Sequence, residues 1–194
     1  ERSRAANVRL REVYAAGFAL DEAHQPHITC LQRFVRTADL DGVYQAISGV
    51  LANENPTTWE LKANKYYYIP FGDLGLAGIV IESTDDLLRF QEKLIDAIAP
   101  FTVPTGTQGS FVTTAEDPEI NQPTIDYVTS FVPESSGDKF NPHVTIGLGP
   151  RQYLDEMIEK EFDTFTFSPA SVSVYQLGNL GTARKKLKGW DLAR

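Results

Sequence analysis

Residues 25–35 read QPHITCLQRFV, and residues 141–149 read NPHVTIGLG. Each stretch holds a proline, a histidine, an apolar residue and a threonine in that order, and the two histidines are 116 positions apart. The chain has 194 residues and only 3 histidines, so two of them stand in matching surroundings. The apolar residues around each histidine predict that both stretches are β-strands.

Successive side chains of a strand point to opposite faces. His27 and Thr29 therefore share one face, and His143 and Thr145 share one face of the second strand. Two such strands side by side would present two imidazoles and two hydroxyls together, which suits displacement at phosphorus. A neutral histidine takes a proton from the attacking oxygen, a protonated one gives a proton to the leaving oxygen, and the hydroxyls bind the phosphate oxygens.

Composition and charge restrict the class of protein. The chain is 42% hydrophobic, which is typical of a globular domain, and it has no apolar run long enough to span a bilayer. Its formal charge of −8 argues against tight binding of a long nucleic acid but allows a small nucleotide. Cys30 is the only cysteine, which excludes an intrachain disulfide and a cysteine-based metal site.

Hydrophobic spacing and capping residues predict intermixed helices and strands, typical of an α+β protein with mostly antiparallel sheets. The chain shows no linker, so we expect one domain over residues 1–194. Helices are predicted at 1–17, 37–53, 83–100 and 150–162, strands at 26–35, 57–70, 77–83, 124–132, 142–148 and 165–178, a loop at 104–122, and a short helix in the basic tail at 181–194.

The twin motifs, PHIT at 26–29 and PHVT at 142–145, resemble those of the two-histidine phosphoesterase superfamily. That superfamily includes the 2′-5′ RNA ligase-like proteins and the cyclic nucleotide phosphodiesterases. The predicted helices at 38–52 and 151–160 and the terminal segment fit its layout, so the resemblance covers nearly all of the chain. It implies a bilobal fold, with two pseudo-symmetric, mostly antiparallel sheets and outer helices around a central cleft.

The resemblance implies a metal-independent phosphoesterase without a cofactor. It would act on a cyclic phosphodiester, of the 2′,3′ type, or on a 2′,5′-linked phosphodiester of a nucleotide or RNA end. His27 and His143 would transfer protons, and Thr29 and Thr145 would bind the phosphate. The sequence does not decide which histidine is the base or in which compartment the protein lies. It also leaves open whether the protein ligates RNA ends, since ligation is the reverse of opening a 2′,5′ bond.

The chain departs from the family in two places. No strand precedes the first helix, so that strand either lies upstream of Glu1 or is missing from the first lobe. Relatives often have an arginine shortly after a motif. The equivalent stretches here are CLQR and IGLG, so we do not expect an arginine clamp on the phosphate.

The third histidine allows an alternative. His24, His27 and His143 could form a three-histidine zinc site of a hydrolase. Residues three apart on a strand point to opposite faces, however, and His24 precedes the strand in a turn-like segment. We therefore expect no metal site.

Residues 57–70 offer candidates for substrate binding. Strict alternation places Tyr66 and Tyr68 on the polar face, where they could stack on a nucleobase, although tyrosines are also simply good strand residues. Lys65 interrupts the apolar face, so a β-bulge could turn it towards the phosphate. The basic tail is interpreted as solvated surface.

We expect the partner to be a nucleotide or an RNA terminus. We expect the protein to be a monomer that binds neither a long nucleic acid nor a membrane. A rival of another class is a non-catalytic module of the same fold that only binds a nucleotide or RNA end. Intact histidines in both motifs favour the enzyme, because a binder needs no acid–base pair.

Overall fold

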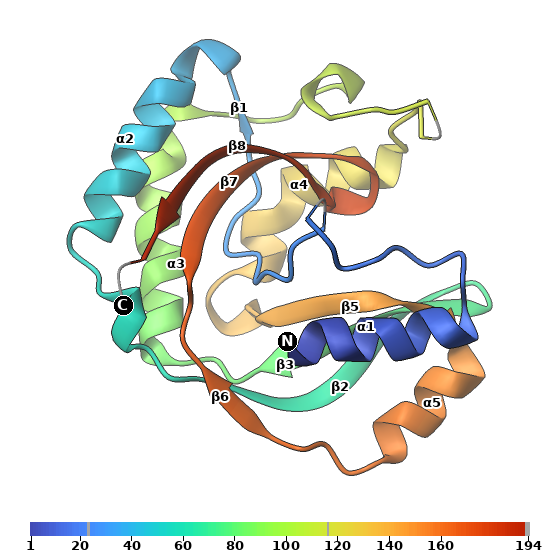
Figure 1. Cartoon of the computed structure of the whole chain (residues 1–194). Helices are drawn as coiled ribbons and strands as arrows, with labels where there is room; N and C mark the ends of the chain where they lie inside the picture. The colour runs from blue at the N-terminus through green and yellow to red at the C-terminus, as the bar shows by residue number, and fades with distance from the viewer. Residues whose placement is uncertain (23, 116, 193–194) are drawn as a thin grey trace. The chain divides into compact units, whose positions relative to one another are not determined.

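The computed structural model describes residues 1–22, 24–115 and 117–192. The fold is α+β, as the sequence predicted, with α-helices and antiparallel sheets in the described residues (Figure 1). No helix in this part of the chain has the length and apolar character that crossing a membrane requires. The chain divides into two compact units: unit 1 comprises Glu1–Thr29, Glu60–Ser83 and Asn141–Phe167, and unit 2 comprises Cys30–Trp59, Thr84–Phe140 and Ser168–Arg194.

Unit 1 is built on a four-stranded antiparallel sheet with the strand order β5-β3-β2-β6. Helix α1 packs along β5, and α5 packs against β2 (Figure 1). Apolar residues of both helices meet those of the sheet, and Leu10 and Leu154 are at most 1% exposed. The elements are α1 (Arg2–Val13), β2 (Leu61–Phe71), β3 (Leu74–Ile81), β5 (His143–Pro150), α5 (Arg151–Glu159) and β6 (Phe165–Phe167).

In the described residues, unit 2 contains three α-helices and two two-stranded sheets. Helix α2 packs on α3, whose first turn is capped by the side chain of Thr84. The segment 104–122 is largely a loop, as predicted, but Phe111 and Ile120 anchor it in a buried cluster with Phe34 and Val128. The elements are β1 (Phe34–Val35), α2 (Leu40–Leu51), α3 (Asp85–Ile98), β4 (Thr102–Val103), α4 (Gln122–Ser135), β7 (Ser171–Leu177) and β8 (Ala183–Asp191).

The strand predicted at 26–35 is mostly absent. Only Ile28 forms a bridge, and Phe34–Val35 forms the short β1. Pro26 has no amide hydrogen to donate to a ladder. The Cys30 carbonyl is taken by the side chain of Gln91, at 3.0 Å, rather than by a neighbouring strand.

The strand predicted at 124–132 is wrong, since these residues lie in helix α4. The β-branched residues of this stretch favour a strand, but the helix start decides the outcome. The Asn121 side chain accepts a hydrogen bond from the Thr124 amide at 2.9 Å, which caps the first turn. Val128 and Phe131 then follow Thr124 on one buried face.

The short helix predicted in the tail is also wrong, because the tail forms β8, paired antiparallel with β7. Residues 193–194 of that prediction lie outside the described residues. The long hairpin curves across unit 2 (Figure 1). Trp190 holds it on α2, since its indole nitrogen donates to the Ser48 hydroxyl at 2.9 Å.

Candidate active site

The second motif lies at the start of β5 in unit 1. His143 pairs with Val80 of β3, and Thr145 pairs with Gly78. Directly paired residues of an antiparallel sheet point to the same face. His143 and Thr145 therefore stand together on one face of the sheet, while Val144 between them is buried on the other.

The first motif joins this sheet through one antiparallel bridge, between the central apolar residues of the two motifs, Ile28 and Val144. Such a bridge brings the residue before one partner next to the residue after the other. Each histidine therefore lies beside the threonine of the other motif. His27 and His143 occupy diagonal positions, for which backbones are typically about 7–8 Å apart. The structure thus brings together the four residues that the sequence singled out.

Both imidazole rings are held in the same way. His27 Nδ1 lies 2.8 Å from the Gln25 carbonyl oxygen, and His143 Nδ1 lies 2.7 Å from the Asn141 carbonyl oxygen. A carbonyl can only accept, so each neutral ring carries its proton on Nδ1 and donates it. Nε2 is then the atom of each ring that can gain or lose a proton during a reaction.

The two rings differ in their surroundings. His27 is exposed, whereas His143 is half-buried. Burial lowers the pKa of His143, because it disfavours the charged ring, and the positive charge of His27 lowers it further. The hydrogen bond to Asn141 opposes both effects but does not reverse them. His143 therefore favours the neutral form.

A β-bulge in β2 decides which side chains accompany the histidines. Ala63 pairs with Ile81, but Lys65 pairs with Val80, so Asn64 is an extra residue in β2. One extra residue moves every following side chain to the other face. Val80 also pairs with the second histidine, so the bulge places the exposed Lys65 on the histidine face.

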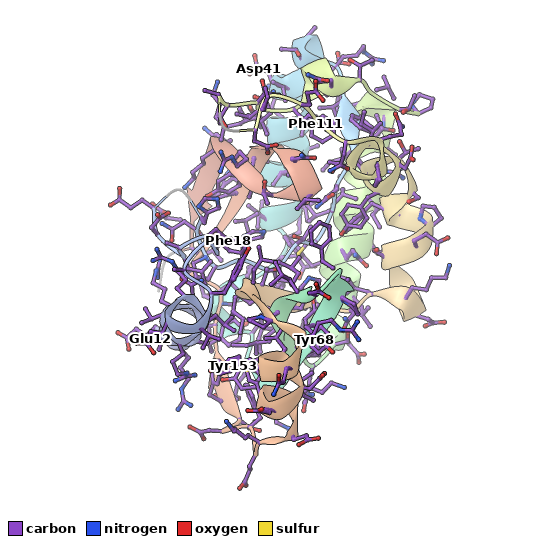
Figure 2. All side chains as sticks on the ribbon, turned by 90° about the vertical axis from the view of Figure 1, so that its right-hand side faces the viewer. Glu12, Phe18, Asp41, Tyr68, Phe111 and Tyr153 are labelled. Carbon is purple, nitrogen blue, oxygen red and sulfur yellow. The ribbon has the colours of Figure 1, made fainter. Side chains whose placement is uncertain are left out.

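The same bulge turns Tyr66 and Tyr68 away from the histidines. The Tyr66 ring meets Phe162 edge-on, with ring centroids 4.8 Å apart. The Tyr68 hydroxyl donates to Asp155 of α5 at 2.5 Å. Figure 2 shows Tyr68 on the side of α5, which also carries Tyr153. Strict alternation, which put both tyrosines on the substrate side, fails at the bulge.

Tyr67 takes their place on the histidine face. It pairs with Gly78, and its ring lies over that glycine: a Cβ on Gly78 would come within 2.3 Å of the ring. The ring meets that of His143 at a centroid distance of 5.1 Å and an angle of 69°. This edge contact is a favourable aromatic arrangement and limits the movement of the His143 ring.

Asn7 of α1 connects both motifs from behind the sheet. Its side-chain nitrogen donates to the Phe18 carbonyl at 2.9 Å and to the Ile146 carbonyl at 2.8 Å. Its side-chain oxygen accepts from the Leu20 amide at 2.9 Å. Asn7 is 3% exposed, and its three bonds connect the segment that leads to His27 with β5.

Sequence reasoning missed Tyr67 and Asn7. A signal existed for Asn7, because it is a polar residue beside Ala6 and Leu10 on the apolar stripe of the helix. Such a residue needs internal partners when it is buried. No signal existed for Tyr67, because its position depends on where the bulge falls and on Gly78, a distant residue in the sequence.

The alternative metal site is not assembled. His24 lies 3.6 Å from Asp21, and its ring packs on Phe18 at 5.5 Å. Within the described residues, no three side chains of His, Cys, Asp or Glu are grouped closely enough to hold a metal ion. The three histidines are therefore not arranged as ligands of one ion.

A family model described as the 2′-5′ RNA ligase superfamily matches residues 2–180, which include both motifs and the sheet of unit 1. The chain belongs to this superfamily. The superfamily is part of the two-histidine phosphoesterases, which confirms the resemblance drawn from the motifs. None of the curated proteins matches the chain significantly. Membership indicates phosphoesterase or ligase-like chemistry on a nucleotide or RNA substrate.

Proposed function

We propose that the protein hydrolyses a cyclic, 2′,3′-type, or 2′,5′-linked phosphodiester of a nucleotide or RNA end. The observation that carries the proposal is the bridge between Ile28 and Val144. It sets two imidazoles on one face, each with Nδ1 bound to a carbonyl and Nε2 available for proton transfer. No step of this chemistry needs a metal ion or an organic cofactor.

The surroundings of the two histidines support an assignment of roles. His143 is the base, because burial and the neighbouring charge favour its neutral form. His27 is then the acid, because the displacement needs a second ring that gives a proton to the leaving oxygen.

The reaction is then an in-line displacement. A water oxygen attacks phosphorus while its proton passes to Nε2 of His143. The bond from phosphorus to the 2′ or 3′ oxygen breaks, and that oxygen takes the proton from Nε2 of His27. Water is consumed, a phosphomonoester and a hydroxyl are formed, and proton exchange with solvent restores the two rings.

The remaining residues of this face bind the phosphate. The hydroxyls of Thr29 and Thr145 lie beside the histidines and can donate to the non-bridging oxygens as charge develops on them. In the described part of the chain, neither hydroxyl is used in an internal hydrogen bond. Lys65 adds a positive charge on the same face. Tyr67 limits the movement of the base and offers a ring edge to the substrate.

The direct test is incubation of the purified protein with 2′,3′-cyclic nucleotides in the presence of a chelator. We expect turnover to a single phosphomonoester that the chelator does not reduce, and no turnover by a His27→Ala, His143→Ala double variant. Saturable binding of the nucleotide without turnover would identify the non-catalytic binding module instead. Loss of activity together with one tightly held zinc per chain would support the three-histidine hydrolase.

A further inference from the structure

The β7–β8 hairpin of unit 2 concentrates positive charge in an acidic protein. Residues 171–191 contain Arg184, Lys185, Lys186 and Lys188 but only one acidic residue, Asp191, which gives this segment a net charge of +3. The whole chain has a net charge of −8. The strand that replaces the predicted tail helix therefore gathers cations that sequence analysis treated as ordinary solvated surface.

The hairpin register keeps three of these cations exposed. Lys185, Lys186 and Lys188 are exposed along β8. Two register shifts interrupt the pairing with β7, one on each side of the Lys185–Lys186 pair. Lys186 lies across Gly189, where a Cβ would come within 2.6 Å of its amino nitrogen. Because paired residues share a face, Lys185 and Lys188 lie on one face of the hairpin and Lys186 lies on the other. The three lysines therefore flank the edge of β8 that no other strand covers in the described structure.

These lysines differ from others in the chain. Lys62 bonds Glu82 at 2.7 Å, Lys93 bonds Glu54 at 2.7 Å, and Lys139 bonds a glutamate at 3.3 Å. Within the described residues, no carboxylate lies within ion-pair distance of the three exposed lysines of β8. Their charges are not neutralised inside the protein and are available to an external anion.

We propose that the β7–β8 hairpin binds the backbone of single-stranded RNA. Lysines along the edge of a strand neutralise successive phosphates, and an aromatic ring beside them stacks on a base without regard to sequence. Tyr175 pairs with Lys186 and so lies on the same face as that lysine, with the hydroxyl of Ser173 next along this face. RNA is the polyanion that the superfamily suggests. This surface needs no acid–base chemistry, so it goes beyond the proposed catalytic function.

A simpler role for the lysines is protection of a sheet edge. In the described structure β8 pairs only with β7, and lysines on an edge strand discourage pairing with other chains. The two roles respond differently to charge reversal. Glutamates protect an edge as lysines do, but they repel RNA.

The experiment measures fluorescence anisotropy of labelled oligouridylates of increasing length with ordinary 3′-hydroxyl ends, which the proposed catalytic site cannot hydrolyse. The test variant replaces Lys185, Lys186 and Lys188 with Gln. The control variant replaces Lys62, Lys139 and Lys160 with Gln, so that both carry the same net charge. We expect affinity to rise with length and to fall at least tenfold in the test variant only.

Salt dependence gives a second readout. Three neutralised phosphates correspond to a slope of about −2 in log affinity against log salt, so a fourfold rise in salt weakens wild-type binding by roughly 20-fold. The Gln variant should lose most of this dependence, and a Lys→Arg variant at the same three positions should keep it. A Lys→Glu variant should stay monomeric, as edge protection requires, and bind RNA more weakly than the Gln variant.

Wild-type affinity in the hairpin Gln variant would overturn the proposal, as would an equal loss in both Gln variants, since bulk charge would then explain the binding. The outcome is independent of catalysis. The hairpin variant should turn over a cyclic mononucleotide at the wild-type rate. The His27→Ala, His143→Ala variant should bind oligouridylate with wild-type affinity.

Discussion

The two motifs share the pattern Pro-His-apolar-Thr but are supported very differently. PHVT lies at the start of β5, an edge strand that a full ladder joins to a four-stranded sheet, and its histidine is half-buried against the ring of Tyr67. PHIT lies in an irregular segment that touches the sheet through one bridge, and its histidine is exposed. A shared sequence signature therefore fixes which atoms face the site, while the surroundings make the two histidines unequal.

That inequality is useful for acid–base chemistry. A pair that transfers two protons in opposite directions works best when one ring is neutral and the other protonated at the same pH. Two equally exposed rings would share these states at random. The burial of His143 and the exposure of His27 decide which ring takes which role.

The largest effect expected is from loss of either histidine. His27→Ala and His143→Ala should each lower kcat by roughly 10²–10⁴-fold with the fold intact, because each removes one proton-transfer group. A phosphodiester with a nitrophenyl leaving group needs no acid, so it should restore much of the rate of the His27 variant but not of the His143 variant. Rescue of the His143 variant instead would exchange the roles of acid and base.

Loss of a threonine hydroxyl should cost less. Thr29→Val and Thr145→Val should each reduce kcat by roughly 10²-fold, the typical effect of removing one donor to a developing charge. The thermal unfolding midpoint should stay near that of the wild type, since neither hydroxyl has an internal partner in the described residues. The exposed Thr166 of β6 provides a matched Thr→Val control. A strong effect at only one threonine would show that the two motifs do not bind the phosphate symmetrically.

Much of unit 1 could be predicted from the sequence. Alternation and flanking prolines predicted β5, and Lys65 within an apolar face was a correct sign of the bulge. The consequence of that bulge could not be followed, because its position within β2 depends on the pairing with Val80. The extra residue of the bulge, Asn64, decides the face of the sheet on which each tyrosine lies.

The failures in unit 2 have two causes. In α4, the β-branched residues after Asn121 favour a strand, and a capping bond together with tertiary burial overrides that preference. In β8, the run of charged residues hides the strand, because a hairpin with exposed lysines lacks the apolar alternation that identifies one. Both outcomes depend on contacts that no local pattern contains.

Loss of the three hydrogen bonds of the Asn7 side chain should destabilise the first motif more than the second. Asn7→Ala leaves two buried carbonyls and one amide without a partner, so we expect the free energy of unfolding to fall by about 2–4 kcal/mol. Amide hydrogen exchange should rise in residues 18–22 and 24–29, which join the sheet through one bridge, and change little in β5, which a full ladder supports. Asn53→Ala, at the exposed end of α2, is the control. Equal loss of protection in both motifs would mean that Asn7 supports the unit as a whole.

The smallest effect, and the finest comparison, is the protonation of His143 itself. Its pKa should lie below the ordinary value of 6.5, because burial is the larger cause and the charge of His27 adds to it. Since the base must be neutral, the loss of activity on the acid side should occur only below that lowered pKa, so the acid limb of the pH–rate profile lies below 6.5. Histidine NMR titration measures the pKa directly, with the His143 signals assigned by their loss in His143→Gln.

His27→Asn should raise the pKa of His143 by removing the repulsion but leave it below 6.5, because the burial stays. Tyr67→Ala, which opens the ring to water, should raise it as well. If the pKa in His27→Asn reached the ordinary value, charge rather than burial would separate the two histidines, and the contrast between a buried and an exposed motif would lose its chemical meaning.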